Sequence, residues 1–334
     1  MSARAGYLLL VMTGAFAACG NEPIAPETPI EMFDAFWTTF DRQYPYFEYK
    51  SVNWDSLRTE FRPRALATGS EADLIALLKE MVAPLRDLHI WFIRPDDVRD
   101  MTYSPTTVVN WDRFVWTRLT DTCNLVYARS ELAHCTMLGY GYVFIGSWND
   151  NFFSIADLDA VIDRYRDSPG MIVDVRPNGG GLDQLGLALA GRFATTQTTI
   201  GFVQYRDGPD RDDFGDQIAR RVSPRGTFQF LKPVIVLAGR GSYSSTETFV
   251  SAMREMPSVT VMGDTTGGAS GNPAQHRLLF WQYSVPRWIE WTADRRVIEW
   301  KGIPPDVVVP WKESEVSSGR DPVLSAALGR LGAR

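Results

Sequence analysis

Apolar and polar positions change their spacing along the chain and so predict regions of different structure. Between residues 29 and 94, apolar side chains recur every three to four residues. They are Met32, Phe33, Phe36, Trp37 and Phe40, then Leu74, Leu77, Leu78, Met81 and Leu85. Because this spacing puts apolar side chains on one face of a helix, we expect an N-terminal helical subdomain over residues 29–94.

Beyond residue 139, short apolar runs alternate with helical stretches. The runs are Tyr142–Ile145, Met171–Val175, Pro233–Leu237 and Val259–Met262, and the helical stretches are Ile155–Tyr165, Leu182–Phe193 and Thr246–Met253. Strands that alternate with helices pair mostly in parallel, because each helix returns the chain to the same edge of the sheet. The pattern predicts an α/β catalytic core with a parallel sheet over residues 139–312. We expect the last part of this core, residues 278–309, to be a β-rich segment.

The remaining segments are assigned by weaker patterns. Periodicity is poor over residues 95–138, which we interpret as a variable connector, and residues 313–334 are expected to form a C-terminal helical tail. The first eighteen residues combine Arg4 with an apolar run over 7–18 that is too short to span a bilayer, which indicates a signal peptide. Residues 19–28 are rich in proline and are expected to be a tether.

The signal peptide ends in Phe16-Ala17-Ala18-Cys19-Gly20, which resembles the lipobox of bacterial lipoproteins. This resemblance implies that Cys19 is lipidated and that the protein is exported to the bacterial cell envelope on a lipid anchor. The alternative is a plain secretory signal with an incidental cysteine. Export permits a disulfide between Cys123 and Cys135, but two free buried thiols are equally compatible with their spacing.

The composition of the chain argues against several classes of function. A 334-residue chain with 45% hydrophobic residues must fold around a core, and a net charge of −6 does not favour nucleic-acid binding. Only three histidines occur, His89, His134 and His276, and they lack the spacing of a metal site. We therefore expect no metal and no cofactor.

Two strand-to-helix turns carry candidate chemistry. In the first, Asp174 to Gly181 ends in three consecutive glycines, whose backbone N–H groups can face an anion at a helix N-terminus. No phosphate-binding motif is present, so a developing oxyanion is the favoured anion, and a plain tight turn is the alternative. In the second, Ser244 precedes a helix and is a candidate nucleophile. Ser244 to Glu247 is also a good capping box, and taken alone this pattern favours Ser244 as only an N-cap.

Five motifs occur in an order that resembles the C-terminal processing, or tail-specific, serine peptidase family. They are Leu85–His89 (Leu-x-Asp-x-His), Asp174–Gly181, Ser244–Glu247, Gly263–Gly268 and Glu299–Val309. The family includes the tricorn protease core and the repeats of interphotoreceptor retinoid-binding protein. The resemblance implies a ClpP/crotonase-like core. The family often carries a PDZ domain between the helical part and the core, but the connector here is about half the length that such a domain needs, so we expect none.

The resemblance places the nucleophile at Ser244. Bacterial processing enzymes use a lysine as base where this chain has Ala269, so the implied base is the tricorn-like histidine, His89. Leu88 stands where glycine is usual. Glu299 is the implied group that orients His89, with Glu290 as a rival. The amides of Gly180, Gly179 and Ser245 would bind the oxyanion.

These residues predict an envelope-anchored serine endopeptidase that acts on peptides or proteins through an acyl-enzyme on Ser244. The alternative is a non-catalytic protein of the same fold that binds a ligand or peptide. The oligomeric state is left open.

Overall fold

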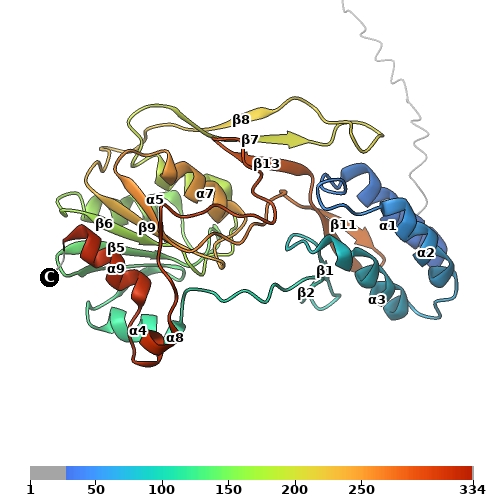
Figure 1. Ribbon diagram of the computed structural model, residues 1–334, viewed down its shortest axis with the longest axis horizontal. Helices are drawn as coiled ribbons and strands as arrows, with labels where there is room; N and C mark the ends of the chain where they lie inside the picture. The colour runs from blue at the N-terminus through green and yellow to red at the C-terminus, as the bar shows by residue number, and fades with distance from the viewer. Residues whose placement is uncertain (1–27, 333–334) are drawn as a thin grey trace, which may run out of the picture.

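Residues 28–332 are described by a computed structural model, and they form a large sheet-based body and a smaller body beside it (Figure 1). The predicted signal peptide, Cys19 and all but the last residue of the predicted tether lie outside the described residues. No helix within residues 28–332 has both the length and the apolar content to cross a bilayer.

The smaller body contains the predicted N-terminal helices, α1 (Pro29–Gln43), α2 (Trp54–Leu66) and α3 (Glu71–Val82), followed by the short 3-10 helix η1 (Ala83–Leu85). Polar side chains fix where these helices begin. Thr28 forms a capping box with Glu31, and the side chains of Asn53 and Ser70 cap α2 and α3. Their apolar faces pack into one aromatic-rich core.

That core is closed by strands from two distant parts of the chain. A four-stranded antiparallel sheet has the order β11 (Ala274–Leu278), β12 (Trp281–Val285), β1 (Trp91–Ile93) and β2 (Arg99–Met101). Phe92 of β1 and Tyr283 of β12 pack against Phe36 of α1. The smaller body is therefore not one continuous segment of the chain. The turn that contains His89 leads directly into β1, an inner strand of this sheet.

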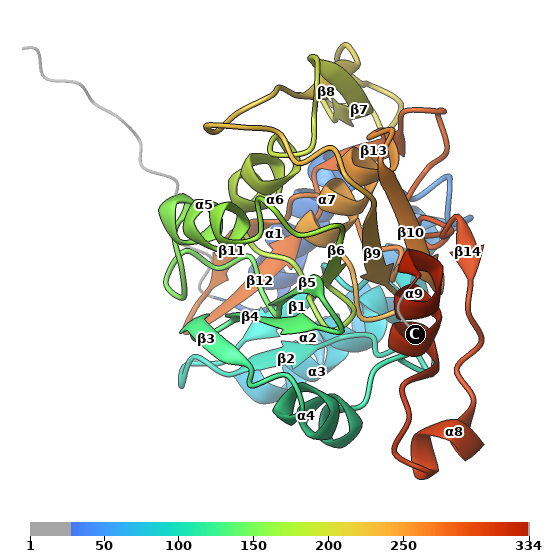
Figure 2. The ribbon, with the colours of Figure 1, turned by 90° about the vertical axis from the view of Figure 1, so that its left-hand side faces the viewer.

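The large body is built on a seven-stranded sheet (Figure 2). In spatial order its strands are β14 (Val307–Val308), β10 (Val259–Gly263), β9 (Val234–Ala238), β6 (Met171–Asp174), β5 (Tyr140–Ile145), β4 (Leu132–Met137) and β3 (Val126–Arg129). The five strands from β14 to β5 are parallel to one another. Strand β4 pairs antiparallel with β5, and β3 pairs antiparallel with β4. The predicted parallel α/β core is confirmed.

Both faces of this sheet are covered. Helices α5 (Ile155–Arg164), α6 (Asp183–Ala190) and α7 (Ser245–Arg254) pack on one face, and α4 (Arg113–Asp121) and α9 (Pro322–Leu331) on the other, with α8 (Glu313–Ser317) between β14 and α9. Along β6, Met171 and Val173 join the first core whereas Ile172 joins the second, as the alternation of strand side chains requires. Burial on both faces explains why these strands are continuous apolar runs.

Two parts of the core differ from the sequence prediction. The segment expected to be a variable connector, 95–138, contains α4, β3 and β4, so its second half is part of the main sheet. The sequence left open whether Cys123 and Cys135 pair; in the structure Cys123, just after α4, and Cys135, on β4, are joined by a disulfide, with Cα atoms 5.8 Å apart. A further antiparallel sheet, β13 (Trp288–Thr292), β7 (Thr198–Tyr205) and β8 (Ile218–Val222), lies beside α6 and α7; strands β7 and β8 were not predicted.

Candidate active site

Ser244 and His89 meet at the boundary between the two bodies. Ser244 follows β9, at the carboxyl end of a parallel strand, and directly precedes α7. His89 lies in the turn between η1 and β1, and its Nε2 atom is 2.9 Å from Ser244 Oγ. This distance is a hydrogen bond, and it is the geometry that a serine nucleophile and its general base require.

The backbone of Ser244 is held in an unusual conformation. Its φ is +59° and its ψ is −132°, a combination that costs about 1–3 kcal/mol for a non-glycine residue. The N–H of Ser244 donates to Ala269 O at 3.0 Å. Since the side chain of Ser244 makes no capping hydrogen bond to α7, it does not act as an N-cap in this structure.

Glu247 also departs from a capping box. Its carboxylate accepts the N–H groups of Gly268 and Ala269 at 2.9 and 2.8 Å and the hydroxyl of Thr266. Burial raises the pKa of Glu247 to about 8, although these three donors favour its ionised form. The side chain therefore holds the 266–269 loop, which in turn holds the backbone of Ser244.

His89 is positioned through its backbone. Its N–H donates to Asp87 Oδ1 at 2.8 Å, and its carbonyl accepts the hydroxyl of Ser284, from β12, at 2.7 Å. Burial lowers the pKa of His89, and the charge of Asp87 partly offsets that effect. At neutral pH the imidazole is therefore neutral and able to accept a proton.

The glycine turn approaches Ser244 closely. Gly180 has a φ of +102°, and a Cβ atom added to it would lie 2.7 Å from Ser244 Cβ, so only glycine fits. Asn178 Oδ1 accepts the Gly180 N–H at 2.9 Å and is also bonded to the Thr246 hydroxyl at 2.8 Å. Asn178 therefore holds the turn and links it to α7.

This hydrogen bond changes the set of candidate oxyanion donors. The Gly180 N–H, which the sequence named as a donor, is already bonded to Asn178. No described residue accepts a hydrogen bond from the N–H of Gly179 or Ser245. Two of the three predicted donors therefore remain available, and both residues line the cavities beside Ser244.

Glu299 does not contact the His89 side chain as the triad hypothesis requires. Its Oε1 accepts Lys50 Nζ at 2.6 Å, and its Oε2 accepts the Ser270 N–H at 3.0 Å. Among the described residues, His89 Nδ1 has no partner in hydrogen-bond geometry. The nearest link between the two runs through Ser270, whose backbone favours the charged form of His89.

Lys50 is a buried residue of the site that the sequence did not identify. Its ammonium lies between Glu299 and Asp87, 2.9 Å from Asp87 Oδ2, and all three side chains are at most 1% exposed. The rings of Tyr46 and Trp300 lie 5.4 and 5.0 Å from Nζ. Lys50 is 249 residues from Glu299 along the chain, so no local motif could have indicated this contact.

One cation shared by two buried carboxylates determines their protonation. Burial alone would raise the pKa of Asp87, but Lys50 lowers it overall. Burial and the negative charge of Asp87 raise the pKa of Glu299 to about 8, although Lys50 opposes the shift. Asp87 is therefore the ionised partner at neutral pH, and Glu299 takes up a proton first.

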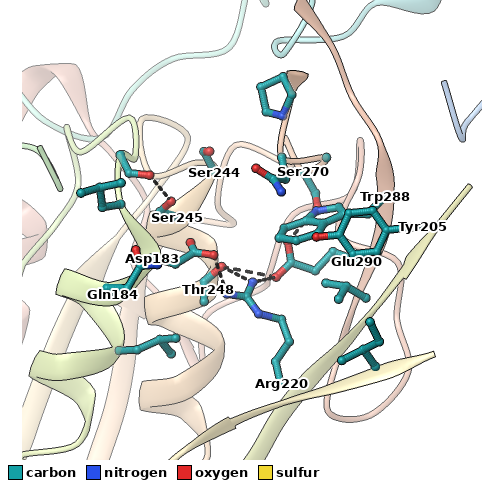
Figure 3. Close-up of a pocket in the computed structure, with 18 residues that line it drawn as sticks. Asp183, Gln184, Tyr205, Arg220, Ser244, Ser245, Thr248, Ser270, Trp288 and Glu290 are labelled. Atoms are coloured by element: carbon teal, nitrogen blue, oxygen red, sulfur yellow. Dashed lines mark hydrogen bonds and ion pairs between the residues drawn. The ribbon is translucent and has the colours of Figure 1, made fainter. Parts of the chain in front are cut away.

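Glu290, the rival to Glu299, lies in a different place. Its Oε1 is 2.7 Å from Arg220 and its Oε2 accepts the Ser270 hydroxyl at 2.8 Å. Burial raises the pKa of Glu290, and Arg220 opposes the shift. Glu290 lines a cavity of about 550 Å³ beside Ser244, together with Arg220 and Asp183 (Figure 3).

A second cavity, of about 440 Å³, opens on the other side of Ser244. It is lined by His89, Trp91, Arg99 and Gly179, and it shares Gly181, Ser244 and Pro273 with the first. Space on both sides of a nucleophile suits an extended chain that crosses it. Within residues 28–332, no group of three or more His, Cys, Asp or Glu side chains is arranged to hold a metal ion.

Comparison with known families agrees with this architecture. The sequence model of peptidase family S41 matches residues 139–309, and that of the tricorn protease C1 domain matches residues 26–83. The chain belongs to peptidase family S41. This confirms the serine-peptidase family that the five motifs predicted. The S41 match covers the main sheet from β5 to β14, including the turns that carry Gly180 and Ser244.

Individual relatives add detail. The carboxy-terminal processing protease CtpA of Bacillus subtilis (strain 168) is 28% identical over 141 residues, which is 41% of this chain and 28% of CtpA. The crystal structure of a proposed peptidase from Parabacteroides merdae ATCC 43184 is 30% identical, covers 91% of this chain and 97% of its own, and superposes with a TM-score of 0.82. The tricorn protease has the same fold, with 15% identity, a TM-score of 0.58, and 91% of this chain and 36% of its own covered.

Proposed function

We propose that this S41 protein is a serine endopeptidase with Ser244 as nucleophile and His89 as general base. The observation that carries the proposal is the 2.9 Å hydrogen bond between Ser244 Oγ and His89 Nε2, in a cleft with cavities on both sides. The neutral imidazole is in the correct form to accept the hydroxyl proton, because burial lowers the pKa of His89.

The reaction follows from these positions. Ser244 Oγ attacks the carbonyl carbon of a peptide bond while His89 Nε2 takes the hydroxyl proton. The carbonyl oxygen becomes an oxyanion, which the free N–H groups of Gly179 and Ser245 stabilise. As the C–N bond breaks, His89 returns the proton to the leaving amine. A water then loses a proton to His89 and attacks the ester, and Ser244 regains its proton when the acid product leaves.

We assign Glu299, Lys50 and Asp87 as positioning residues. Asp87 holds the backbone of His89, and Glu299 holds the Ser270 peptide that acts on the imidazole. Lys50 joins the two carboxylates. Asp87, ionised and buried near His89, favours the imidazolium that forms during proton transfer.

The nucleophile is tested with a fluorophosphonate probe, which reacts with an activated serine. Wild type is expected to be labelled on Ser244 and to cleave casein. Ser244→Ala and His89→Ala are expected to hydrolyse casein at least about a thousandfold more slowly. Ser258→Ala, at a serine outside the site, is the control and keeps both activities. A wild-type protein that reacts with neither probe nor casein but binds a small ligand or peptide supports the non-catalytic alternative.

We further propose that the protein is exported and anchored in the cell envelope by lipid on Cys19, on the strength of the Phe16–Gly20 sequence. Growth of the host with labelled palmitate tests this directly. Full-length protein is expected in the membrane fraction with label, and Cys19→Ala in the soluble fraction without it. Label that persists in Cys19→Ala contradicts the anchor at this residue.

A further inference from the structure

The two cavities beside Ser244 receive opposite sides of the scissile bond. His89 must protonate the leaving amine, so the leaving segment lies on the side of His89. His89 lines the smaller cavity, of about 440 Å³, and does not line the larger one. The larger cavity, about 550 Å³, therefore receives the residue that supplies the acyl group, the P1 residue. This assignment rests on the proposed function.

The P1 cavity has charged groups at the end away from Ser244. Figure 3 shows the Arg220 head group between Asp183 and Glu290, with Ser245 next to Asp183 and Ser244 farther from these charges. Arg220 is 2.5 Å from Asp183 Oδ2 and 2.7 Å from Glu290 Oε1. Two carboxylates thus face one guanidinium, and the cavity has an excess of negative charge when both are ionised.

One carboxylate oxygen is available to a ligand. No described group donates to Asp183 Oδ1, and the Asp183 side chain is 25% exposed. The guanidinium is already bonded to both carboxylates and to the Thr248 hydroxyl, at 2.8 Å. An entering side chain therefore finds an unpaired acceptor rather than an unpaired cation.

The same cavity is also lined by apolar and aromatic side chains. They are Leu182, Leu187, Val203, Tyr205, Ile218 and Trp288. Such side chains suit the methylene stem of a long side chain. An apolar P1 side chain would desolvate the free oxygen of Asp183 without replacing its hydrogen bonds, and an acidic one would meet two carboxylates.

We propose that this cavity selects lysine or arginine as the P1 residue, with Asp183 as the residue that recognises its charge. The protein then cleaves on the carboxyl side of basic residues. The methylene stem of this side chain packs against the apolar residues of the cavity, and its ammonium or guanidinium donates to Asp183 Oδ1.

The test uses a pair of diphenyl phosphonate inhibitors, one with a lysine-like and one with a leucine-like P1 side chain, at pH 8. Wild type is expected to be inactivated at least about tenfold faster by the lysine-like inhibitor, since one factor of ten corresponds to 1.4 kcal/mol of interaction. In Asp183→Asn, which preserves shape, this preference should fall about tenfold while inactivation by the leucine-like inhibitor is retained. Asp167→Asn, an exposed carboxylate after α5, is the matched control and should keep the preference.

The outcomes separate the two proposals. If a fluorophosphonate labels Ser244 but wild type prefers the leucine-like inhibitor, or Asp183→Asn leaves the lysine preference unchanged, the P1 assignment is overturned and the peptidase proposal stands. If neither phosphonate nor fluorophosphonate reacts with Ser244 in folded protein, the proposed function itself is overturned. Circular dichroism of each variant confirms folding before its rates are compared.

Discussion

Two charged clusters flank the Ser244–His89 pair, and each places one cation between two carboxylates. In the first, Lys50 lies between Asp87 and Glu299, and none of the three side chains is more than 1% exposed. In the second, Arg220 lies between Asp183 and Glu290, with exposures of 12%, 25% and 8%. The same charge pattern thus occurs once sealed from solvent and once in the wall of a cavity.

The difference in exposure separates their roles. A sealed cluster cannot reach a substrate, but its carboxylates can hold the backbone that surrounds His89. A cluster in a cavity wall keeps an oxygen available to a ligand and tolerates changes in its ion pairs, because water partly screens them. We infer that the Lys50 cluster acts on the geometry of the site and the Arg220 cluster on the choice of substrate.

The largest expected effect is on stability, from Lys50→Met. Loss of the ammonium leaves Asp87 and Glu299 buried without a cation, which should cost about 3–5 kcal/mol of unfolding free energy. Urea denaturation followed by tryptophan fluorescence measures it. Lys79→Met is the control, because the Lys79–Asp100 pair is partly exposed and is expected to contribute less than about 1 kcal/mol. Equal effects of the two substitutions would remove the distinction between a sealed cluster and a partly exposed ion pair.

Arg220→Met should be milder, at about 1–2 kcal/mol, because Asp183 stays in contact with water. Removal of the guanidinium also leaves the cavity more negative. The same urea titration gives the stability, and the inhibitor pair gives the P1 preference, which should shift further toward lysine. A loss of stability as large as that of Lys50→Met would show that the second cluster is structural as well.

Glu299→Gln and Glu290→Gln compare the two clusters in catalysis. Glu299 accepts Lys50 through one oxygen and the Ser270 N–H through the other, whereas glutamine has a single oxygen for the two donors. The weaker hold on the Ser270 peptide beside His89 should lower kcat about tenfold with little change in KM. Glu290 contributes to the cavity instead, and Glu290→Gln should change KM for P1-lysine substrates more than kcat. Steady-state kinetics on a P1-lysine peptide separates the two parameters. A common effect on kcat in both variants contradicts the division of roles.

The smallest expected effect is a shift in the pH profile. His89 must be neutral to act as base, so kcat/KM should rise with pH through the pKa of His89, which burial lowers below its usual 6.5. The Asp87 charge raises that pKa, so Asp87→Asn should move the acid limb to lower pH. Glu299→Gln should leave the acid limb in place, because the pKa of Glu299 is about 8 and it is already protonated there. An acid limb that moves with Glu299→Gln and not with Asp87→Asn would reverse the assignment.

Much of the core could be predicted because its signals are local. The runs Met171–Val175 and Val259–Met262 are continuous apolar segments, and they form strands buried on both faces. Strand β3 was missed because it is exposed at the sheet edge and its pattern is not that of a buried strand. Strand β4 is buried, but His134 and Thr136 interrupt its apolar run. Strands β7 and β8 were missed for a related reason, since their pairing with β13 is decided by packing above α6 and α7.

The candidate site divides in the same way. Motif order named Ser244 and His89, which the structure places 2.9 Å apart. It also named Glu299, but only the fold shows that this carboxylate bonds Lys50 and the Ser270 N–H rather than the imidazole. The sequence predicts Gly180 as an oxyanion donor. In the structure its N–H donates to Asn178 instead, and glycine is needed at this position because the turn passes so close to Ser244.

The sequence by itself determined the features that depend on neighbours along the chain. These are the buried parallel strands of the core, the helices between them and the glycine turn. The tertiary structure alone decided the contacts between distant residues, such as His89 with Ser244, 155 residues apart, and Arg220 with Glu290, 70 apart. The physical reason is that propensity and capping act within a few residues, whereas burial, ion pairing and protonation depend on which groups the completed fold brings together.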